Sequence, residues 1–175
     1  LSAGLTTGVF GFLAAHELIH SRDPRERAVG LLFLASVFYM HFRIAHVYGH
    51  HRRAATSDDA ATARLGEGLY AFLLRTLCGQ FREAWTFEAE RLRRRRRAVI
   101  SVDNRMLHYL AIEGALLLIV ALLSWRALAF LLSVATIAIA LLEGFNYVAH
   151  YGLLRKTRAD GTIEALAPIH SWNSS

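Results

Sequence analysis

Two pairs of histidines are spaced so that each pair could bind one metal ion. His16 and His20 lie four residues apart, and His46 and His50 repeat the spacing, with His51 directly after. On an α-helix, residues four apart lie on one face, so both imidazoles of a pair can reach the same ion. His51 should point about 100° away from His50, where it could serve a second ion nearby. The pattern predicts metal binding.

The choice of metal depends on the histidines beyond the first pair. His16 and His20 flank Glu17 in an HExxH pattern, where two histidines hold zinc and the glutamate is a general base. An intramembrane zinc metalloprotease is therefore one interpretation, but it needs only one further ligand and leaves most other histidines, His150 included, without a role. Many imidazoles and few carboxylates suit a pair of transition-metal ions such as iron. A haem-binding membrane anchor is a third, non-enzymatic interpretation.

The elements that must position these histidines are apolar and long. The chain is 54% hydrophobic, above the roughly 45–50% of a typical soluble domain. The apolar residues concentrate at 1–19, 28–49 and 106–148, whereas 50–105 is charged. This distribution predicts an all-α, integral-membrane helical bundle.

Residues 106–148 predict a membrane hairpin with arms from about Met106 to Leu123 and from about Ala127 to Val148, each near the roughly 20 residues of a spanning helix. Residues 52–105 are rich in arginine, so by the positive-inside rule this side should be cytoplasmic. The hairpin then returns the chain to that side at His150. We expect the histidine clusters at the cytoplasmic ends of the helices.

Residues 28–48 are also long and apolar enough to cross a membrane. A crossing would place His20 and His46 on opposite faces, where they could not share a metal site. His41 and Arg43 within this segment favour a helix that lies along the interface or in a half-buried groove.

Ionisable residues within the expected hairpin are costly and usually face a polar interior. We interpret His108 as an interfacial residue near a helix end. Glu113 lies deeper in the same arm. Glu143, two turns before His150, is expected to support the metal ligands.

The net charge of +6 comes almost entirely from arginine, including a run at 91–97. Such a run is found in nucleic-acid-binding proteins, but in a chain with membrane spans topology is the simpler explanation, so we predict no nucleic-acid partner. Cys78 is the sole cysteine, which excludes a disulfide framework and a CxxC zinc ribbon within this sequence.

The histidine motifs resemble those of the membrane-bound alkane hydroxylase (alkane 1-monooxygenase) family, within the membrane fatty-acid desaturase and hydroxylase superfamily. The segment His16–His20 matches the first histidine box and His46–His51 the second. Asn146-Tyr147 with His150-Tyr151-Gly152-Leu153 resembles the family's NYxEHYGL motif, which desaturases lack, and Pro168–Asn173 is similar to the stretch before the last box. Ala45 and Ala149 stand where the family usually has glutamate.

The resemblance implies two non-haem iron ions, with the ligands His16, His20, His46, His50, His51 and His150. It places a further set near the site: Glu17, Glu143, Asn146, Tyr147, Tyr151 and His170. It also implies that alkanes and O2 are converted to primary alcohols, with electrons from rubredoxin and its NAD(P)H-dependent reductase, at a bacterial inner membrane with the metals on the cytoplasmic side. Another superfamily member, such as a desaturase or a xylene-type hydroxylase, is an alternative.

The arginine-rich region could dock an acidic rubredoxin, or it could only fix topology and contact lipid phosphates. The last histidine box is absent from the sequence, so we expect a fragment of one membrane oxygenase domain that is inactive alone. Within it, 1–51 carries the first two boxes, 52–105 is cytoplasmic or interfacial, 106–148 is the hairpin, and 149–175 is a cytoplasmic region.

Overall fold

The computed structural model describes residues 1–156, 158 and 162–172, so the motif residue Asn173 lies outside the described part. The regular elements there are helical, which confirms the predicted all-α class. In chain order they are α1 (Ser2–Thr6), η1 (Thr7–Gly11), α2 (Phe12–His20), α3 (Pro24–Ala35), α4 (Phe42–Ile44), η2 (Ala45–His50), α5 (His51–Arg53), α6 (Leu69–Arg94), α7 (Arg105–Leu123), α8 (Trp125–His150) and η3 (Pro168–His170).

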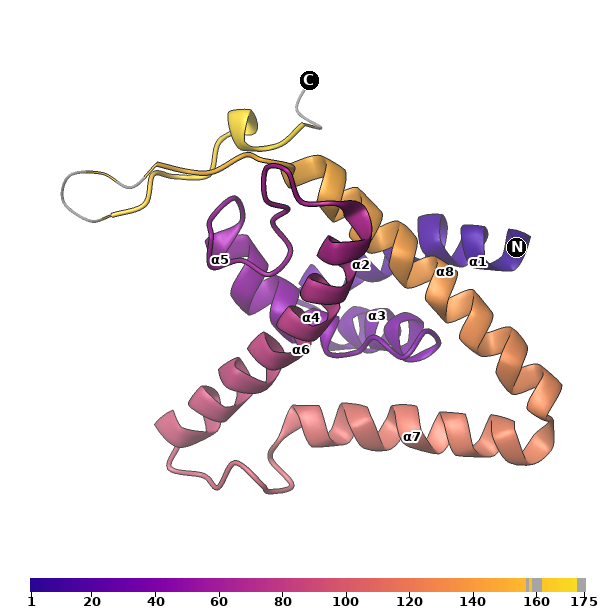
Figure 1. The fold of residues 1–175 in the computed structure, drawn as a ribbon. Coiled ribbons are helices and arrows are strands. Elements are labelled where there is room, and N and C mark those ends of the chain that lie inside the picture. Colours follow the sequence, from indigo (N-terminus) through magenta and orange to yellow (C-terminus); the bar gives the residue numbers. More distant parts are fainter. Residues whose placement is uncertain (157, 159–161, 173–175) are drawn as a thin grey trace.

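The first three elements follow one another without a break, and α1 and η1 pack against α8 (Figure 1). Two glycines four residues apart, Gly4 and Gly8, form the contact. A Cβ atom at Gly8 would lie 3.0 Å from the Cα of Ala138, so only glycine allows this approach of the two backbones. Small residues at four-residue spacing are typical of helix contacts in membranes.

Helices α2 and α3 form a tight hairpin that fixes the first histidine pair. Asp23 caps α3 by accepting a hydrogen bond from the Arg25 amide at 2.8 Å, and Pro24 occupies the first helical position. Ala15 and Ile19 of α2 are buried in the same core as Leu34 of α3. This buried face leaves His16 and His20 on another face of α2.

Residues 28–48 do not form the single helix that their apolar composition predicts. α3 ends at Ala35, and the chain reverses through a turn in which Phe38 has a φ of 57° and the Tyr39 amide donates to the Leu34 carbonyl at 2.9 Å. Composition did not reveal the break, because both short segments are largely apolar and both contribute buried residues to one core. The reversal brings His46 beside His20.

Helix α6 is long and amphipathic. Its buried residues Phe72, Thr76, Gln80, Ala84 and Glu88 recur every four positions, which makes one continuous stripe. This stripe packs against η2 and α8 and so supports both histidine-bearing elements.

Helices α7 and α8 are the two elements long and apolar enough to cross a membrane, by length and composition, among the described residues. Their most apolar windows have mean hydropathies of 2.1 and 2.2, and only 17% of each window is buried, so most of their apolar surface is exposed in this structure. The N-caps Asn104 and Ser124 begin them, and Ser124 alone separates them. They open as a V, and α8 returns its last residue, His150, to the α2–α5 region (Figure 1).

Candidate metal centre

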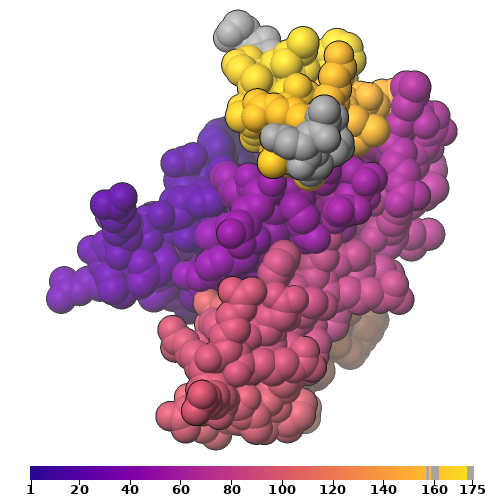
Figure 2. Space-filling view, turned by 90° about the vertical axis from the view of Figure 1, so that its left-hand side faces the viewer, coloured from indigo at the N-terminus to yellow at the C-terminus, as the bar shows by residue number. Residues whose placement is uncertain are grey.

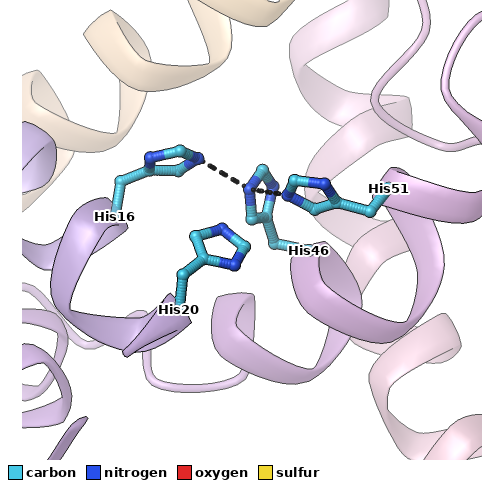
Figure 3. Close-up of side chains that lie close together, drawn as sticks. All are labelled: His16, His20, His46 and His51. Atoms are coloured by element: carbon cyan, nitrogen blue, oxygen red, sulfur yellow. Dashed lines mark hydrogen bonds between the residues drawn. The ribbon is translucent and has the colours of Figure 1, made fainter. Parts of the chain in front are cut away.

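Four histidines converge from two helical segments. His16 and His20 come from α2, and His46 and His51 from the η2–α5 segment, and all four rings point into one space (Figure 3). One ring nitrogen of each lies within 4.8 Å of those of the others. The His46 Nε2 atom is 2.8 Å from the Nε2 of His16 and 2.9 Å from that of His51.

The second histidine motif departs from the α-helical geometry assumed from its spacing. η2 is a π-helical turn, in which residues five apart stack. His46 and His51 therefore face the same space, with their ring centroids 4.5 Å apart, whereas we expected His51 to be directed elsewhere. His50 instead lies beside His150. Gly49 permits the turn to approach α6, since a Cβ there would lie 2.8 Å from the Phe87 ring.

The arrangement of the four rings favours binding of a cation over hydrogen bonding between the imidazoles. A neutral imidazole has one donor and one acceptor nitrogen, and the single lone pair of His46 Nε2 faces two other Nε2 atoms. Two metal–nitrogen bonds of about 2.1 Å at a right angle place their nitrogens about 3.0 Å apart, close to the separations found here. A shared metal ion would use the converging lone pairs.

The protonation of these rings also favours a metal. Burial, followed by the charges of the neighbouring imidazoles, lowers the pKa of His46 far below its usual value. The same causes lower the pKa of His51 to about 4, and burial with His16 lowers that of His20. At neutral pH these imidazoles are uncharged, which is the form that binds metal ions.

His50 and His150 form a second group beside the first. Their ring centroids are 5.1 Å apart, and the His50 ring stacks on His46 at 5.2 Å. The Nδ1 of His50 donates to the Asp59 carboxylate at 2.9 Å, and the Nδ1 of His150 donates to the His170 carbonyl at 3.2 Å. Each contact leaves Nε2 with a free lone pair, the usual arrangement of a metal-binding histidine.

Asp59 is the residue that sequence reasoning missed. Its side chain is buried, and its Oδ2 accepts both the His50 bond and one from the Thr62 hydroxyl at 2.7 Å. Burial alone would raise the pKa of Asp59, but the bond to His50 and its charge lower it on balance. No pattern in the sequence separates Asp59 from the adjacent Asp58.

Glu17 lies outside the converging rings. Its carboxylate is 3.6 Å from the Nδ1 of His16, whereas the His16 Nε2 faces the cluster, and its side chain is 76% exposed. A general base for metal-bound water would have to face the same space as Nε2.

Glu143 is fully buried and receives hydrogen bonds from four uncharged side chains. The donors come from three segments: Tyr39 at 2.9 Å, Gln80 at 2.9 Å, Thr76 at 3.1 Å and Asn146 at 3.1 Å. The carboxylate thus ties α6 and the turn after α3 to α8. Asn146, one of its donors, lines the cavity described below.

The other expected residues hold the end of α8 in place. The Tyr147 hydroxyl donates to the Glu67 carbonyl at 2.7 Å, and the Tyr151 hydroxyl accepts from the Gly66 amide at 3.1 Å. Gly152, with a φ of 68°, then lets the chain leave the helix. These contacts fasten α8 to the 63–67 loop and leave His150 facing His50.

The C-terminal segment, yellow at the top of Figure 2, covers the last turn of α8. His170 is buried and pairs through Nε2 with Glu164 at 2.9 Å. The Trp172 amide donates to the Ala149 carbonyl at 2.9 Å. Together they hold the HSW part of the motif directly over His150.

A cavity of about 540 Å³ opens between the two histidine groups. Its polar lining consists of imidazoles with Asn146 and Ser171, and its apolar lining includes Phe145, Val148, Leu166 and Trp172. Ala149 also lines it, at the position where the motif resemblance leads one to expect glutamate. The arrangement places a mostly apolar space beside candidate metal ligands.

Comparison with known proteins agrees with this site. The sequence model of the fatty acid desaturase family matches residues 1–175, so the chain belongs to that family. It is 40% identical over its whole length to alkane 1-monooxygenase 1 of Pseudomonas aeruginosa and 39% identical over 98% of its length to the alkane 1-monooxygenase of Acinetobacter baylyi. It is 34% identical over 99% of its length to the hydroxylase component of a xylene/toluene monooxygenase from Pseudomonas putida.

The chain spans less than half of these relatives, 46%, 43% and 46% of their respective lengths. The resemblance inferred from the histidine motifs is confirmed, and the similarity to oxidoreductases extends over the whole described fold.

Proposed function

We propose that the protein containing this chain hydroxylates the terminal carbon of alkanes, using O2 and two non-haem iron ions. The observation that carries the proposal is the convergence of histidine rings from α2, η2–α5 and α8 beside one largely apolar cavity. His16, His20, His46 and His51 would hold one iron. His50 and His150 would supply ligands to the other, together with residues outside this chain.

When bound, the irons would activate O2 toward an unactivated C–H bond. The chain's own residues position and shield the reacting partners. An alkane is an apolar chain that gains by leaving water, so the Phe145, Val148 and Trp172 side of the cavity would hold it near the imidazoles. The Asp59 and His170 contacts would orient the rings of His50 and His150.

The similarity to alkane and xylene/toluene monooxygenases supports an oxygenase, and the geometry disfavours the zinc protease. Glu17 would be the general base of an HExxH protease, yet it is exposed and lies behind the His16 ring. Four imidazoles around one space, with two more beside them, also exceed what a single catalytic zinc needs. A desaturase or a xylene-type hydroxylase would use the same ligands and differ in substrate.

The location and the partners belong to the same proposal. α7 and α8 would cross a bacterial inner membrane, with the histidines at its cytoplasmic side, and the arginine-rich 52–105 region supports that orientation by the positive-inside rule. Electrons would come from rubredoxin and its NAD(P)H-dependent reductase.

Metal analysis of the full-length protein, combined with product analysis, tests the proposal. We expect about two irons per chain and conversion of octane to 1-octanol that carries one atom of ¹⁸O from ¹⁸O2. His150→Ala should abolish the product and lower the iron content, whereas His108→Ala, at an exposed position away from the cluster, should change neither. One zinc per chain, or full activity of the His150 variant, would refute the assignment.

A further inference from the structure

A second cavity, of about 420 Å³, lies away from the histidines, between η2–α5 and the last turns of α6. It is strongly basic. Five arginine side chains line it: Arg52, Arg91, Arg94, Arg95 and Arg105. The rest of the lining includes Tyr48, Phe87 and Glu90. The cavity plays no part in the metal site.

Two of these arginines are fixed in place before any ligand binds. The buried Glu88 carboxylate accepts from Arg91 Nη2 and from Arg105 Nη2, both at 2.6 Å. The Arg105 guanidinium also lies over the Tyr48 ring, 5.3 Å from its centroid. Side chains that are already ordered lose little conformational entropy on binding, which strengthens recognition of a matching group.

The carboxylates around the cavity do not balance its charge. The lining holds five guanidinium groups and one carboxylate, that of Glu90, and with the buried Glu88 also counted the excess is three positive charges. Glu90 contributes weakly, because its contact with Arg94 is 3.7 Å long and exposed. The cavity therefore attracts an anion.

The position of the cavity indicates which anion. Arg105 is the first residue of α7, where α6 and its following loop meet the apolar helix (Figure 1). Beyond it, α7 exposes large apolar side chains, among them Ile112, Leu118 and Leu122. A ligand that uses both features has an anionic phosphate attached to long apolar chains.

We propose that this cavity binds the phosphate group of an anionic membrane phospholipid, with the acyl chains along the exposed face of α7. Arginine is suited to the role because its planar guanidinium binds phosphate oxygens in a bidentate way. An acidic partner protein would match the charge but would make no use of the adjacent apolar face.

The arginine run provides a charge-matched test. Arg94 and Arg95 line the cavity, whereas the neighbouring Arg93 and Arg96 do not. We would measure binding of phosphatidylglycerol to the full-length protein in detergent by native mass spectrometry. Because each arginine near a phosphate contributes about a factor of five, Arg94→Gln/Arg95→Gln should weaken binding about thirtyfold. Arg93→Gln/Arg96→Gln should change it less than about threefold.

Three results would overturn the proposal. Equal losses in both double variants would mean diffuse surface charge. Full displacement of the lipid by millimolar inorganic phosphate would indicate a free-anion site. Protection of the cavity arginines by purified rubredoxin, without retention of phosphatidylglycerol over phosphatidylcholine, would indicate a protein-docking site. Because the readout is lipid binding, its failure leaves the proposed oxygenase activity untouched.

Discussion

Replacement of Asp59 by asparagine tests whether the carboxylate beside His50 orients a metal ligand. In the native chain, Asp59 Oδ2 accepts from His50 Nδ1 at 2.9 Å and from the Thr62 hydroxyl at 2.7 Å. In the native chain, Asp59 Oδ1 is buried and has no hydrogen-bond partner among the described residues. An asparagine that keeps both bonds through its oxygen must place its NH2 group at this position. The buried amide then costs about 1–3 kcal/mol.

The expected loss of metal affinity is similar in size to this cost of burying an unpaired amide. Loss of an outer partner of a metal-binding histidine typically reduces metal affinity about 10–100-fold, which corresponds to about 1.4–2.8 kcal/mol. We therefore expect Asp59→Asn to weaken binding of one iron(II) ion by about this factor. Chelator competition on the full-length protein at pH 7 measures it.

Asp58→Asn is the matched control. It removes the same charge at the adjacent, exposed position, where the carboxylate accepts a long hydrogen bond of 3.4 Å from the Ser57 hydroxyl. Its iron affinity should equal that of the native protein. If Asp59→Asn unfolds at a lower temperature but binds both irons normally, Asp59 serves only to brace its loop, and the orienting role is refuted.

Two further predictions concern the stability of the fold, each measured by thermal unfolding of the full-length protein in detergent. Glu88 is buried, and paired arginines lower its pKa from 4.5 to about 2 against the opposing effect of burial. Its ionised form therefore stabilises the fold above about pH 4.5, and this contribution disappears as the pH falls toward about 2. Glu88→Gln should lower the free energy of unfolding by about 1–3 kcal/mol at pH 7, and its difference from the native protein should shrink in acid. The exposed Glu90→Gln should have little effect. A difference between Glu88→Gln and the native protein that does not change with pH would contradict this linkage. Gly8→Ala should lower the free energy of unfolding by about 1–3 kcal/mol, because its Cβ meets the Ala138 backbone. Gly144→Ala places its Cβ in open space and should be neutral or stabilising. Equal effects of the two substitutions would refute the close contact at Gly8.

The sequence predicted the parts of the site that follow regular periodicity. His16 and His20 lie on one α-helical face because four-residue spacing matches the α-helix. The hairpin of α7 and α8 was also foreseeable, because long apolar runs with a one-residue break leave few alternatives. Recognition of the motifs supplied His150, whose distance from the other histidines in sequence carries no geometric information.

The reversal at Phe38, the π-helical turn before His51 and the position of Asp59 depend on tertiary contacts, which leave no periodic pattern in the sequence. The reversal at Phe38 is set by packing of residues from two largely apolar segments in one core, and neither proline nor glycine marks the break. The π-helical turn before His51 changes which histidines face each other without changing their spacing in sequence. Asp59 lies in an irregular loop, where only the folded chain shows which of two adjacent aspartates turns inward.

The π-helical turn makes chain length as important as residue identity in this part of the protein. Such a turn contains one residue more than the α-helical turn it replaces, so deleting Val47 would restore α-helical register between Ala45 and His50. His46 and His51 would then be four residues apart on an α-helix and would still share a face, whereas in an α-helix of unchanged length they would lie about 140° apart around the axis. Homologous sequences aligned here should therefore combine a five-residue separation of these histidines with a π-helical turn, or a four-residue separation with an α-helical turn.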